Sequence, residues 1–330
     1  MNTVYLGKSG IAISPLGFGT MSFGGDADEA MSGRLYGACR DAGITLFDCA
    51  DVYAGGRSEE ILGKLIAPHR EEVVITSKGY FPTGKGANAR GSTRLHLIHA
   101  VEASLKRLNT DRIDIYFLHR MDDRTPMDQT LRAIEHLISQ GKILYLGLSN
   151  FAAWQIVKAM GVSALHDWSP LVAIQPMYNL IKRTAEAEIL PMAVSEGLGV
   201  LPYSPLAGGL LTGKYSESLP DSKGRLVENK MYGIRYGVPT YQDSAAAFCA
   251  YAKEHGHHPV SLAIRWVASH PAVTAPLIGA RNLIQLAPAL ESANIPMSEA
   301  TRTEISQLTP APALATDRNE ESSQHNYGSR

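Results

Sequence analysis

The chain has 330 residues, of which 45% are apolar, and its formal net charge is −1 at pH 7. This composition allows a large buried core, and the balanced charge argues against a nucleic-acid groove or an anionic membrane as the partner. No apolar run approaches the roughly 18 residues of a membrane span, and no amino-terminal stretch resembles a signal peptide. Three widely spaced cysteines, Cys39, Cys49 and Cys249, form no zinc or redox motif, so we expect a cytoplasmic protein without a metal site.

The amino-terminal residues predict a small β-hairpin. Apolar residues at 4–6 and 11–13 flank the sequence LGKSG, whose two glycines suit a turn. Residues 16–20 then predict the first strand of the main sheet. The sequence GFGTMSFGG follows, but its glycines have the wrong spacing for a dinucleotide-binding fingerprint, which favours a plain loop.

From residue 28 onward, helical and strand-like patterns alternate. The helical patterns fill residues of about 28–42, 57–66, 92–108, 126–140, 151–164, 183–196, 258–270 and 282–293. The strand-like runs fill about 44–47, 73–77, 113–118, 143–148, 172–175, 198–202 and 274–278. Such alternation implies parallel strands with crossover helices. A doubly wound sheet could also be drawn from this order. The eight near-regular units, together with the family resemblance given below, favour one closed (β/α)₈ TIM barrel over residues 1–330.

Two insertions and a tail interrupt this regularity. The longer insertion covers about 204–257 and contains an extra helical pattern near 241–255, and the shorter one covers 79–91. Both should open onto the carboxyl-end face of the barrel, where long loops can wall a pocket. Residues of about 309–330 are polar and rich in Ala, Pro and Ser, which predicts a mobile tail.

Polar side chains follow three successive predicted strands. Asp48 and Tyr53 come after the strand at 44–47, while Lys78 and His119 end the apolar runs VVITSK and IDIYFLH. Because the carboxyl ends of parallel strands meet at one face, we expect these side chains to share a site. Taken singly, each could instead be structural, as a turn aspartate, a packed tyrosine, an ion pair or a half-buried histidine.

The four side chains together suit proton transfer to a carbonyl group. A tyrosine with its ordinary pKa of about 10 is a poor proton donor near neutral pH. The Lys78 ammonium should lower the pKa of Tyr53, and Asp48 should keep Lys78 charged. Tyr53 could then act as a general acid toward an oxygen that His119 orients. None of these groups can carry a hydride, so the chemistry requires a cofactor.

Six segments, taken in order, resemble the aldo-keto reductase superfamily of the bacterial type: FDCADVYAGGRSEEILG, VITSKG, DIYFLHR, GKILYLGLSNF, IQPMYNL and YSPLAGGLLTGKY. The resemblance spans residues 16 to about 290. It implies a (β/α)₈ barrel with an amino-terminal β-hairpin and long carboxyl-face loops. The catalytic tetrad of that family is Asp, Tyr, Lys and His, which implies catalytic roles for Asp48, Tyr53, Lys78 and His119.

The resemblance also implies a nicotinamide nucleotide that lies extended across the barrel mouth. Ser149, Asn150 and Gln175 match the residues that hold the carboxamide, and Tyr203 matches the aromatic residue that stacks on the nicotinamide ring. The residues that match the loop over the pyrophosphate are Ser204, Leu206, Gly208 and Lys214.

The segment IGARNLIQL resembles the phosphate-recognition segment of the family and contains Gly279, Arg281 and Gln285. Arg281 would clamp the 2′-phosphate of NADP, with Gln285 as a neighbouring contact. The acid and the asparagine that usually face the adenine are replaced here by Pro288 and Ala289. Arg281 predicts NADP as the cofactor, and the loss of the usual adenine contacts leaves NAD as a possible second one.

The substrate end of the pocket can be predicted only from strand ends. The residues expected there are Met21, Phe23, Tyr80, Phe81, Arg120, Met121 and Tyr178. The histidines at 255, 257 and 258 favour a polar helix end over a metal site.

Three functions fit these predictions. The first is an NADP-dependent oxidoreductase that reduces an aldehyde or ketone to an alcohol. The second is an alcohol or sugar dehydrogenase that works in the oxidative direction. The third is a cofactor-binding regulatory subunit, because the resembled superfamily includes potassium-channel β-subunits. In the first two cases the partner is a small-molecule carbonyl or alcohol.

Overall fold

The computed structural model describes the whole chain except residues 216–223, 319, 321–322 and 324–330. At its centre, the described residues form an eight-stranded sheet with the strand order β10-β3-β4-β5-β6-β7-β8-β9. Neighbouring strands in this order are parallel. The strands are β3 (Gly17–Gly19), β4 (Leu46–Asp48), β5 (Val74–Gly79), β6 (Ile113–Leu118), β7 (Ile143–Ser149), β8 (Leu171–Gln175), β9 (Gly199–Val200) and β10 (Leu277–Ile278).

The first and last strands of this order are joined by backbone hydrogen bonds. The Thr274 N–H donates to the Val200 carbonyl oxygen over 2.9 Å, and the Leu277 N–H donates to the Pro202 carbonyl oxygen over 2.9 Å. The sheet therefore closes on itself, and the predicted (β/α)₈ barrel is confirmed. The open, doubly wound alternative is wrong.

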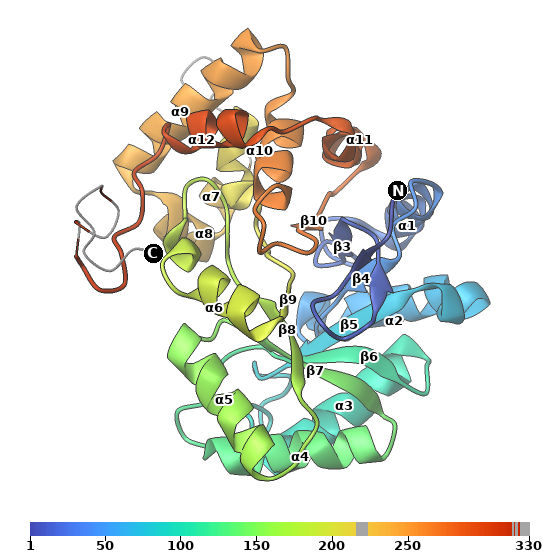
Figure 1. Cartoon of the computed structure of the whole chain (residues 1–330). Helices are drawn as coiled ribbons and strands as arrows, with labels where there is room; N and C mark the ends of the chain where they lie inside the picture. The colour runs from blue at the N-terminus through green and yellow to red at the C-terminus, as the bar shows by residue number, and fades with distance from the viewer. Residues whose placement is uncertain (216–223, 319, 321–322, 324–330) are drawn as a thin grey trace.

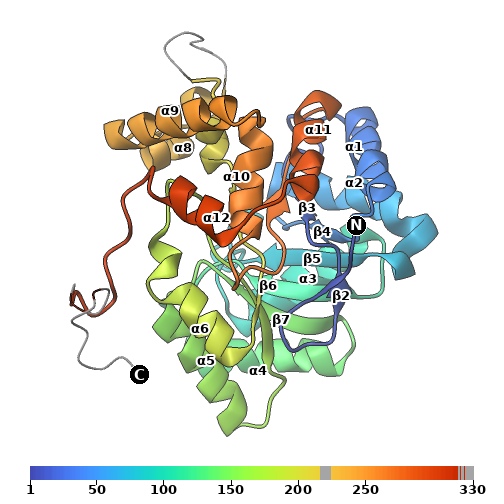
Figure 2. The same cartoon turned by 45° about the horizontal axis from the view of Figure 1, so that its top comes forward.

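Helices surround the sheet (Figures 1 and 2). The barrel helices are α1 (Glu29–Asp41), α2 (Arg57–Ile66), α3 (Arg94–Leu108), α4 (Met127–Ser139), α5 (Ala153–Leu165), α6 (Ile189–Glu196), α10 (Pro259–Ala268) and α11 (Leu283–Glu291). The 3₁₀ turns are η1 (Tyr53–Gly56), η2 (Ala67–Glu72), η3 (Thr184–Glu186), η4 (Ala207–Thr212) and η5 (Ser292–Asn294).

Side-chain caps fix the starts of helices. At α1, for example, Asp28 Oδ1 accepts a hydrogen bond from the Met31 N–H. The helix predicted from residue 183 begins only at Ile189, because η3 precedes it.

The predicted hairpin is present and packs against the amino-terminal end of the barrel. Strands β1 (Val4–Tyr5) and β2 (Ala12–Ile13) pair antiparallel. The Lys8 N–H donates to the Gly197 carbonyl oxygen over 2.9 Å, and Leu6 is fully buried. A Cβ on Gly199 would lie 2.2 Å from Leu6 Cδ1, so glycine at this position lets the hairpin approach β9.

The long insertion folds into more helices than the sequence predicted. The extra helix expected at 241–255 is confirmed as α9 (Pro239–Glu254), whereas α7 (Arg225–Glu228) and α8 (Lys230–Tyr236) were not predicted. Helix α12 (Glu299–Ser306) was not predicted either and follows the barrel. Much of the predicted mobile tail lies outside the described residues. No described helix has the length and apolar character that a membrane span requires.

Candidate active site

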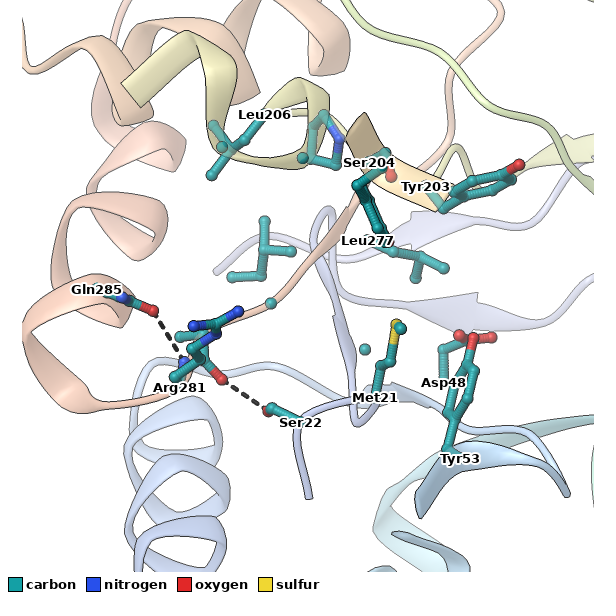
Figure 3. A pocket seen from close by; sticks show the side chains of 18 of the residues that line it. Met21, Ser22, Asp48, Tyr53, Tyr203, Ser204, Leu206, Leu277, Arg281 and Gln285 are labelled. Atoms are coloured by element: carbon teal, nitrogen blue, oxygen red, sulfur yellow. Dashed lines mark hydrogen bonds between the residues drawn. The ribbon is translucent and has the colours of Figure 1, made fainter. Parts of the chain in front are cut away.

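A cavity of about 950 Å³ opens at the carboxyl ends of the barrel strands. Its lining includes all the predicted catalytic and cofactor-binding residues except Lys78: Asp48, Tyr53, His119, Ser149, Asn150, Gln175, Tyr203, Ser204, Leu206, Gly208, Lys214, Gly279, Arg281 and Gln285. Figure 3 shows Asp48 and Tyr53 at one end and Arg281 and Gln285 at the other. The structure thus brings together side chains from many strand ends in one elongated site.

A buried ion pair forms the floor of this cavity. Lys78 is completely buried, and its ammonium group donates to Asp48 Oδ2 over 2.5 Å and to the Cys49 carbonyl oxygen over 2.7 Å. Asp48 Oδ1 also accepts hydrogen bonds from Thr76 Oγ1 at 2.5 Å and Gln175 Nε2 at 2.8 Å. Burial acts to lower the pKa of Lys78, but the attraction and hydrogen bond of Asp48, together with the attraction of Tyr53, outweigh it and the pKa is raised. Lys78 is therefore an ammonium ion at neutral pH.

Tyr53 lies between this ammonium group and the cavity. It is half-buried, and its hydroxyl oxygen lies 3.4 Å from Lys78 Nζ. Tyr53 begins the turn η1, in which Ala54, Gly55 and Gly56 have φ angles of 48°, 64° and 94°. This left-handed run makes a tight turn that carries the chain from β4 into α2 and leaves the tyrosine facing the cavity.

The direction of the Tyr53 pKa shift differs from the sequence-based expectation. Burial raises the pKa of Tyr53 to about 12, although the Lys78 ammonium acts to lower it. The expectation of a lowered pKa was wrong because it omitted burial, which depends on the tertiary structure. Tyr53 is therefore a neutral phenol at pH 7, and Lys78 is placed to stabilise the phenolate that would follow proton loss.

His119 lies beside Tyr53 just beyond β6. The two rings meet edge to face with centroids 6.3 Å apart. Burial, with added repulsion from Lys78, lowers the pKa of His119 to about 3, so the imidazole is neutral. His119 Nδ1 is buried and has no hydrogen-bond partner among the described residues. A neutral ring of this kind can orient a polar group without adding charge.

The residues predicted to hold a nicotinamide form a hydrogen-bonded row. Asn150 Nδ2 donates to the His119 carbonyl oxygen over 2.9 Å, and the Tyr203 hydroxyl donates to Asn150 Oδ1 over 2.6 Å. Ser149 Oγ donates to the Gln175 carbonyl oxygen over 2.9 Å. These bonds link the predicted carboxamide contacts to the aromatic ring of Tyr203.

The predicted phosphate-binding part begins with backbone in unusual conformations. Ser204 has a φ of 59°, while Gly208 and Gly209 have φ angles of 68° and 100°. A Cβ on Gly208 would lie 2.8 Å from Tyr232 Cδ1, so the loop fits closely against α8. Lys214 supplies a cation in this part of the cavity lining. Close backbone approach and a cation suit a phosphate group.

Arg281 lies before α11, as predicted, and it has a partner that the sequence did not reveal. Gln285 Oε1 accepts a hydrogen bond from the Arg281 N–H over 3.0 Å, as Figure 3 shows. The guanidinium Nε lies 3.0 Å from Asp26 Oδ2 in a partly exposed ion pair. Asp26 follows the glycine-rich loop after β3 and is distant from Arg281 in sequence, so no local pattern links them.

The predicted substrate walls are partly wrong. Met21, Phe81 and Arg120 line the cavity, whereas Tyr80 and Met121 do not. Phe23 is completely buried and packs against Phe18, with ring centroids 5.7 Å apart.

Tyr178 is wrong for a different reason. It is completely buried, and its hydroxyl donates to Glu186 Oε1 over 2.5 Å and accepts from Arg302 Nη2 over 2.9 Å. Its polar group thus serves an interior network away from the cavity lining.

Several cavity residues were missed by sequence reasoning. Helix α8 supplies Met231, Tyr232 and Arg235, whose only sequence signal was their place in the long insertion. His258 also lines the cavity and caps α10 by accepting from the Val260 N–H, as a polar helix end would. The described residues contain no group of three or more potential metal ligands suited to a metal ion.

Comparisons with known proteins identify the family of this chain. The model of the aldo/keto reductase family matches residues 15–309. The oxidoreductase YrpG of Bacillus subtilis (strain 168), itself uncharacterised, is 37% identical over 327 residues, which cover 96% of this chain and 98% of YrpG. A probable voltage-gated potassium channel β-subunit of Arabidopsis thaliana is 38% identical, with 85% of this chain and 88% of the relative covered. A protein described in the same words from Oryza sativa subsp. japonica is 39% identical, with 83% of this chain and 86% of the relative covered.

Proposed function

Because the chain belongs to the aldo/keto reductase family, we propose that it reduces an aldehyde or a ketone to an alcohol with NADPH, with Tyr53 as the proton donor. The observation that carries this proposal is the buried Asp48–Lys78 pair directly beneath the Tyr53 hydroxyl. Tyr53 can give its hydroxyl proton to a carbonyl oxygen, and an ammonium ion in this position would stabilise the phenolate that remains.

The residues present fit a nicotinamide nucleotide. The cavity volume of about 950 Å³ lies within the range of cofactor sites, and Lys214 and Arg281 line it together with the catalytic group. When bound, the cofactor would supply the hydride. Ser149, Asn150 and Gln175 would hold the carboxamide, and Tyr203 would stack on the ring.

The protein's own residues would handle the proton. Tyr53 would donate its hydroxyl proton to the substrate oxygen, and the Lys78 ammonium at 3.4 Å would stabilise the resulting phenolate. Asp48 holds Lys78 charged and in place, and neutral His119 would orient the substrate oxygen by a hydrogen bond. Met21 and Phe81 would supply apolar walls around the carbonyl.

Cofactor choice and cellular location belong to the same proposal. Arg281 favours NADP, because its guanidinium suits the 2′-phosphate that NAD lacks. The described structure holds its three cysteines as free thiols, which suits the reducing cytoplasm, where NADPH is abundant.

A second candidate function is favoured by two of the relatives. The plant proteins are described as probable channel β-subunits, and this chain shares 38% and 39% identity with them. A protein of that kind would bind the nucleotide as a sensor and turn over slowly or not at all. The oxidative direction, with an alcohol or sugar as substrate, is a variant of the first function.

The test is a turnover assay in both directions: NADPH with a panel of aldehydes, ketones and sugars for reduction, and NADP⁺ with the corresponding alcohols and sugars for oxidation. Wild type should oxidise NADPH with at least one carbonyl. Tyr53→Phe should lose about 10²–10⁴-fold in kcat. Its NADPH affinity, measured by fluorescence titration, should stay close to wild type because the nucleotide contacts are unchanged.

Tyr5→Phe is the matched control, because Tyr5 is 68% exposed on the hairpin. A Tyr53→Phe protein with near-normal turnover would assign the proton to another group. Tight NADPH binding without turnover of any carbonyl or alcohol would favour the sensor function instead.

A further inference from the structure

A second cavity lies beside α3, next to Asp51, which precedes the turn η1. It has a volume of about 410 Å³ and shares no lining residue with the first cavity. Its walls come from the connection after β5, at Asn88, and from α3, at Leu95, His96 and Arg107. Asp51 also lines it, two residues before the turn η1 begins. A space of this size can hold a small organic molecule.

Asp51 is the unusual residue of this cavity. It is only 2% exposed, and neither carboxylate oxygen has a partner in full hydrogen-bond geometry among the described residues. A buried carboxylate without such partners is costly, and native proteins rarely leave one so. Burial, with added repulsion from Glu59, raises the pKa of Asp51 to about 7, although Arg107, the neighbouring Val52 backbone N–H and Lys78 act against the rise.

The nearest cation, Arg107, is already engaged by another carboxylate. Its Nε donates to Glu59 Oε2 over 2.7 Å, and Nη2 lies 2.7 Å from the same oxygen. Glu59 is fully buried, and its other oxygen accepts from Ser77 Oγ over 2.5 Å. Arg107 is thus paired mainly with Glu59, and its attraction for Asp51 does not offset the burial of that carboxylate, whose pKa stays raised.

His96 supplies a second unpartnered group. It is 3% exposed, and its Nε2 has no hydrogen-bond partner among the described residues. Burial, with added repulsion from His99, lowers the pKa of His96, so the ring is neutral. The Asn88 backbone hydrogen-bonds the ring and acts to raise that pKa, as a carbonyl that accepts from Nδ1 would. Nε2 then keeps a lone pair that can accept a hydrogen bond.

The unpartnered groups of the cavity are therefore acceptors, and one of them is an acid. A fitting ligand must donate hydrogen bonds and carry positive charge. The described residues hold no set of three metal ligands, whereas Leu95, Ala100 and Ala103 supply aliphatic wall. We propose that the second cavity binds a small primary amine as its ammonium ion, with Asp51 holding the charge and His96 Nε2 accepting a further hydrogen bond.

The test is calorimetric titration of the full-length protein with n-butylammonium chloride at pH 7.5 and constant ionic strength. Wild type should bind it, and Asp51→Asn should bind at least about tenfold more weakly, because the amide keeps the shape but removes the charge. Asp128→Asn is the control, since Asp128 is an exposed acid in the first turn of α4. This variant should match wild type.

Further measurements separate the alternatives. Ala103→Leu keeps Asp51 but narrows the cavity, so it should also weaken amine binding. 1-Butanol, which has the same chain without the charge, should not bind detectably. Equal amine affinity in Asp51→Asn and wild type, binding of 1-butanol as tight as that of the amine, or full displacement of the amine by an equal concentration of potassium would each overturn the proposal. Binding is measured without turnover, so the result is independent of the proposed reductase activity.

Discussion

At the residue scale, opposed interactions set the charges of the active site. Burial acts to lower the pKa of Lys78, but Asp48 at 2.5 Å helps to keep it an ammonium ion. The same burial keeps Tyr53 protonated, with a pKa of about 12, and keeps His119 neutral, with a pKa of about 3. Tyr53 is thus a neutral phenol, Lys78 an ammonium ion and His119 a neutral imidazole at pH 7. The proposed reduction needs a protonated tyrosine at the start of the reaction, and this protonation state supports that proposal.

Asp26 provides a prediction about cofactor affinity. Its carboxylate occupies the Arg281 guanidinium at 3.0 Å, where a 2′-phosphate would bind. Asp26→Asn should free the guanidinium and tighten NADPH binding about fivefold, as expected from the ~1 kcal/mol of a partly exposed ion pair. NADH binding should not change, because NADH has no 2′-phosphate. Fluorescence titration with both nucleotides measures this.

Arg281→Ala is the companion variant. It should weaken NADPH binding by roughly tenfold to a hundredfold, which corresponds to about 1.5–3 kcal/mol for a charge-assisted contact. Equal losses for NADPH and NADH would show that Arg281 is structural. A wild-type protein that prefers NADH would contradict the choice of NADP.

At the element scale, helix packing is set by small residues at a few contacts. Gly63 in α2 faces the end of α3, where a Cβ would lie 2.5 Å from the Leu108 carbonyl oxygen and 2.7 Å from the Arg107 carbonyl oxygen. Backbone atoms cannot rotate away as a side chain can. Gly63 therefore sets the distance between the two helices, which the Arg107–Glu59 pair also joins.

Gly63→Ala should lower the free energy of unfolding by about 1–3 kcal/mol, the usual cost of overpacking. Gly37→Ala is the matched control in α1, because no heavy atom lies within 4 Å of its Cβ position. Gly37→Ala should instead raise the free energy of unfolding by up to about 1 kcal/mol, since alanine favours the helix. Urea unfolding followed by circular dichroism would compare them. Similar effects of both changes would rule out the close contact as the cause.

At the scale of the whole molecule, closure of the barrel brings distant residues to one face. Asp48 and Gln175 are 127 residues apart and share a hydrogen bond of 2.8 Å beneath the cavity. Barrel packing also buries Asp51 against charged neighbours from other elements, including Glu59 and Arg107. The stability of the fold should therefore depend on the protonation of this one carboxyl group.

Asp51→Asn tests this dependence. The pKa of Asp51 is raised from 3.8 to about 7 in the folded protein, so folding favours the protonated acid. Its stabilising contribution is complete below pH 4 and is lost as the pH rises through about 7. An asparagine cannot ionise. As the pH rises from 5 to 8, the free energy of unfolding of the variant should therefore increase by about 1–3 kcal/mol relative to that of wild type. Urea unfolding across this range, in buffers without amines, measures the difference, and a difference that stays constant with pH would refute it.

Local patterns were enough to predict the alternating elements and the residues at strand ends. Strands and helices leave their periods in the sequence, and parallel strands must place their carboxyl ends on one face. Asp48, Tyr53 and His119 could therefore be assigned to one cavity, and Lys78 to the strand beneath it, before any coordinates. Their catalytic roles stay predictions. Helices α7, α8 and α12 were missed because they lie outside the repeating barrel unit.

Only the tertiary structure decided the features that depend on contacts between distant segments. The Asp26–Arg281 pair joins the loop after β3 to the connection between β10 and α11, and no sequence spacing links them. Phe23 and Tyr178 follow strand ends as predicted, yet packing turns both into the core. The raised pKa of Tyr53 and the unpartnered Asp51 both arise from burial. Burial is a property of the assembled barrel, because it depends on which segments exclude water from a given atom.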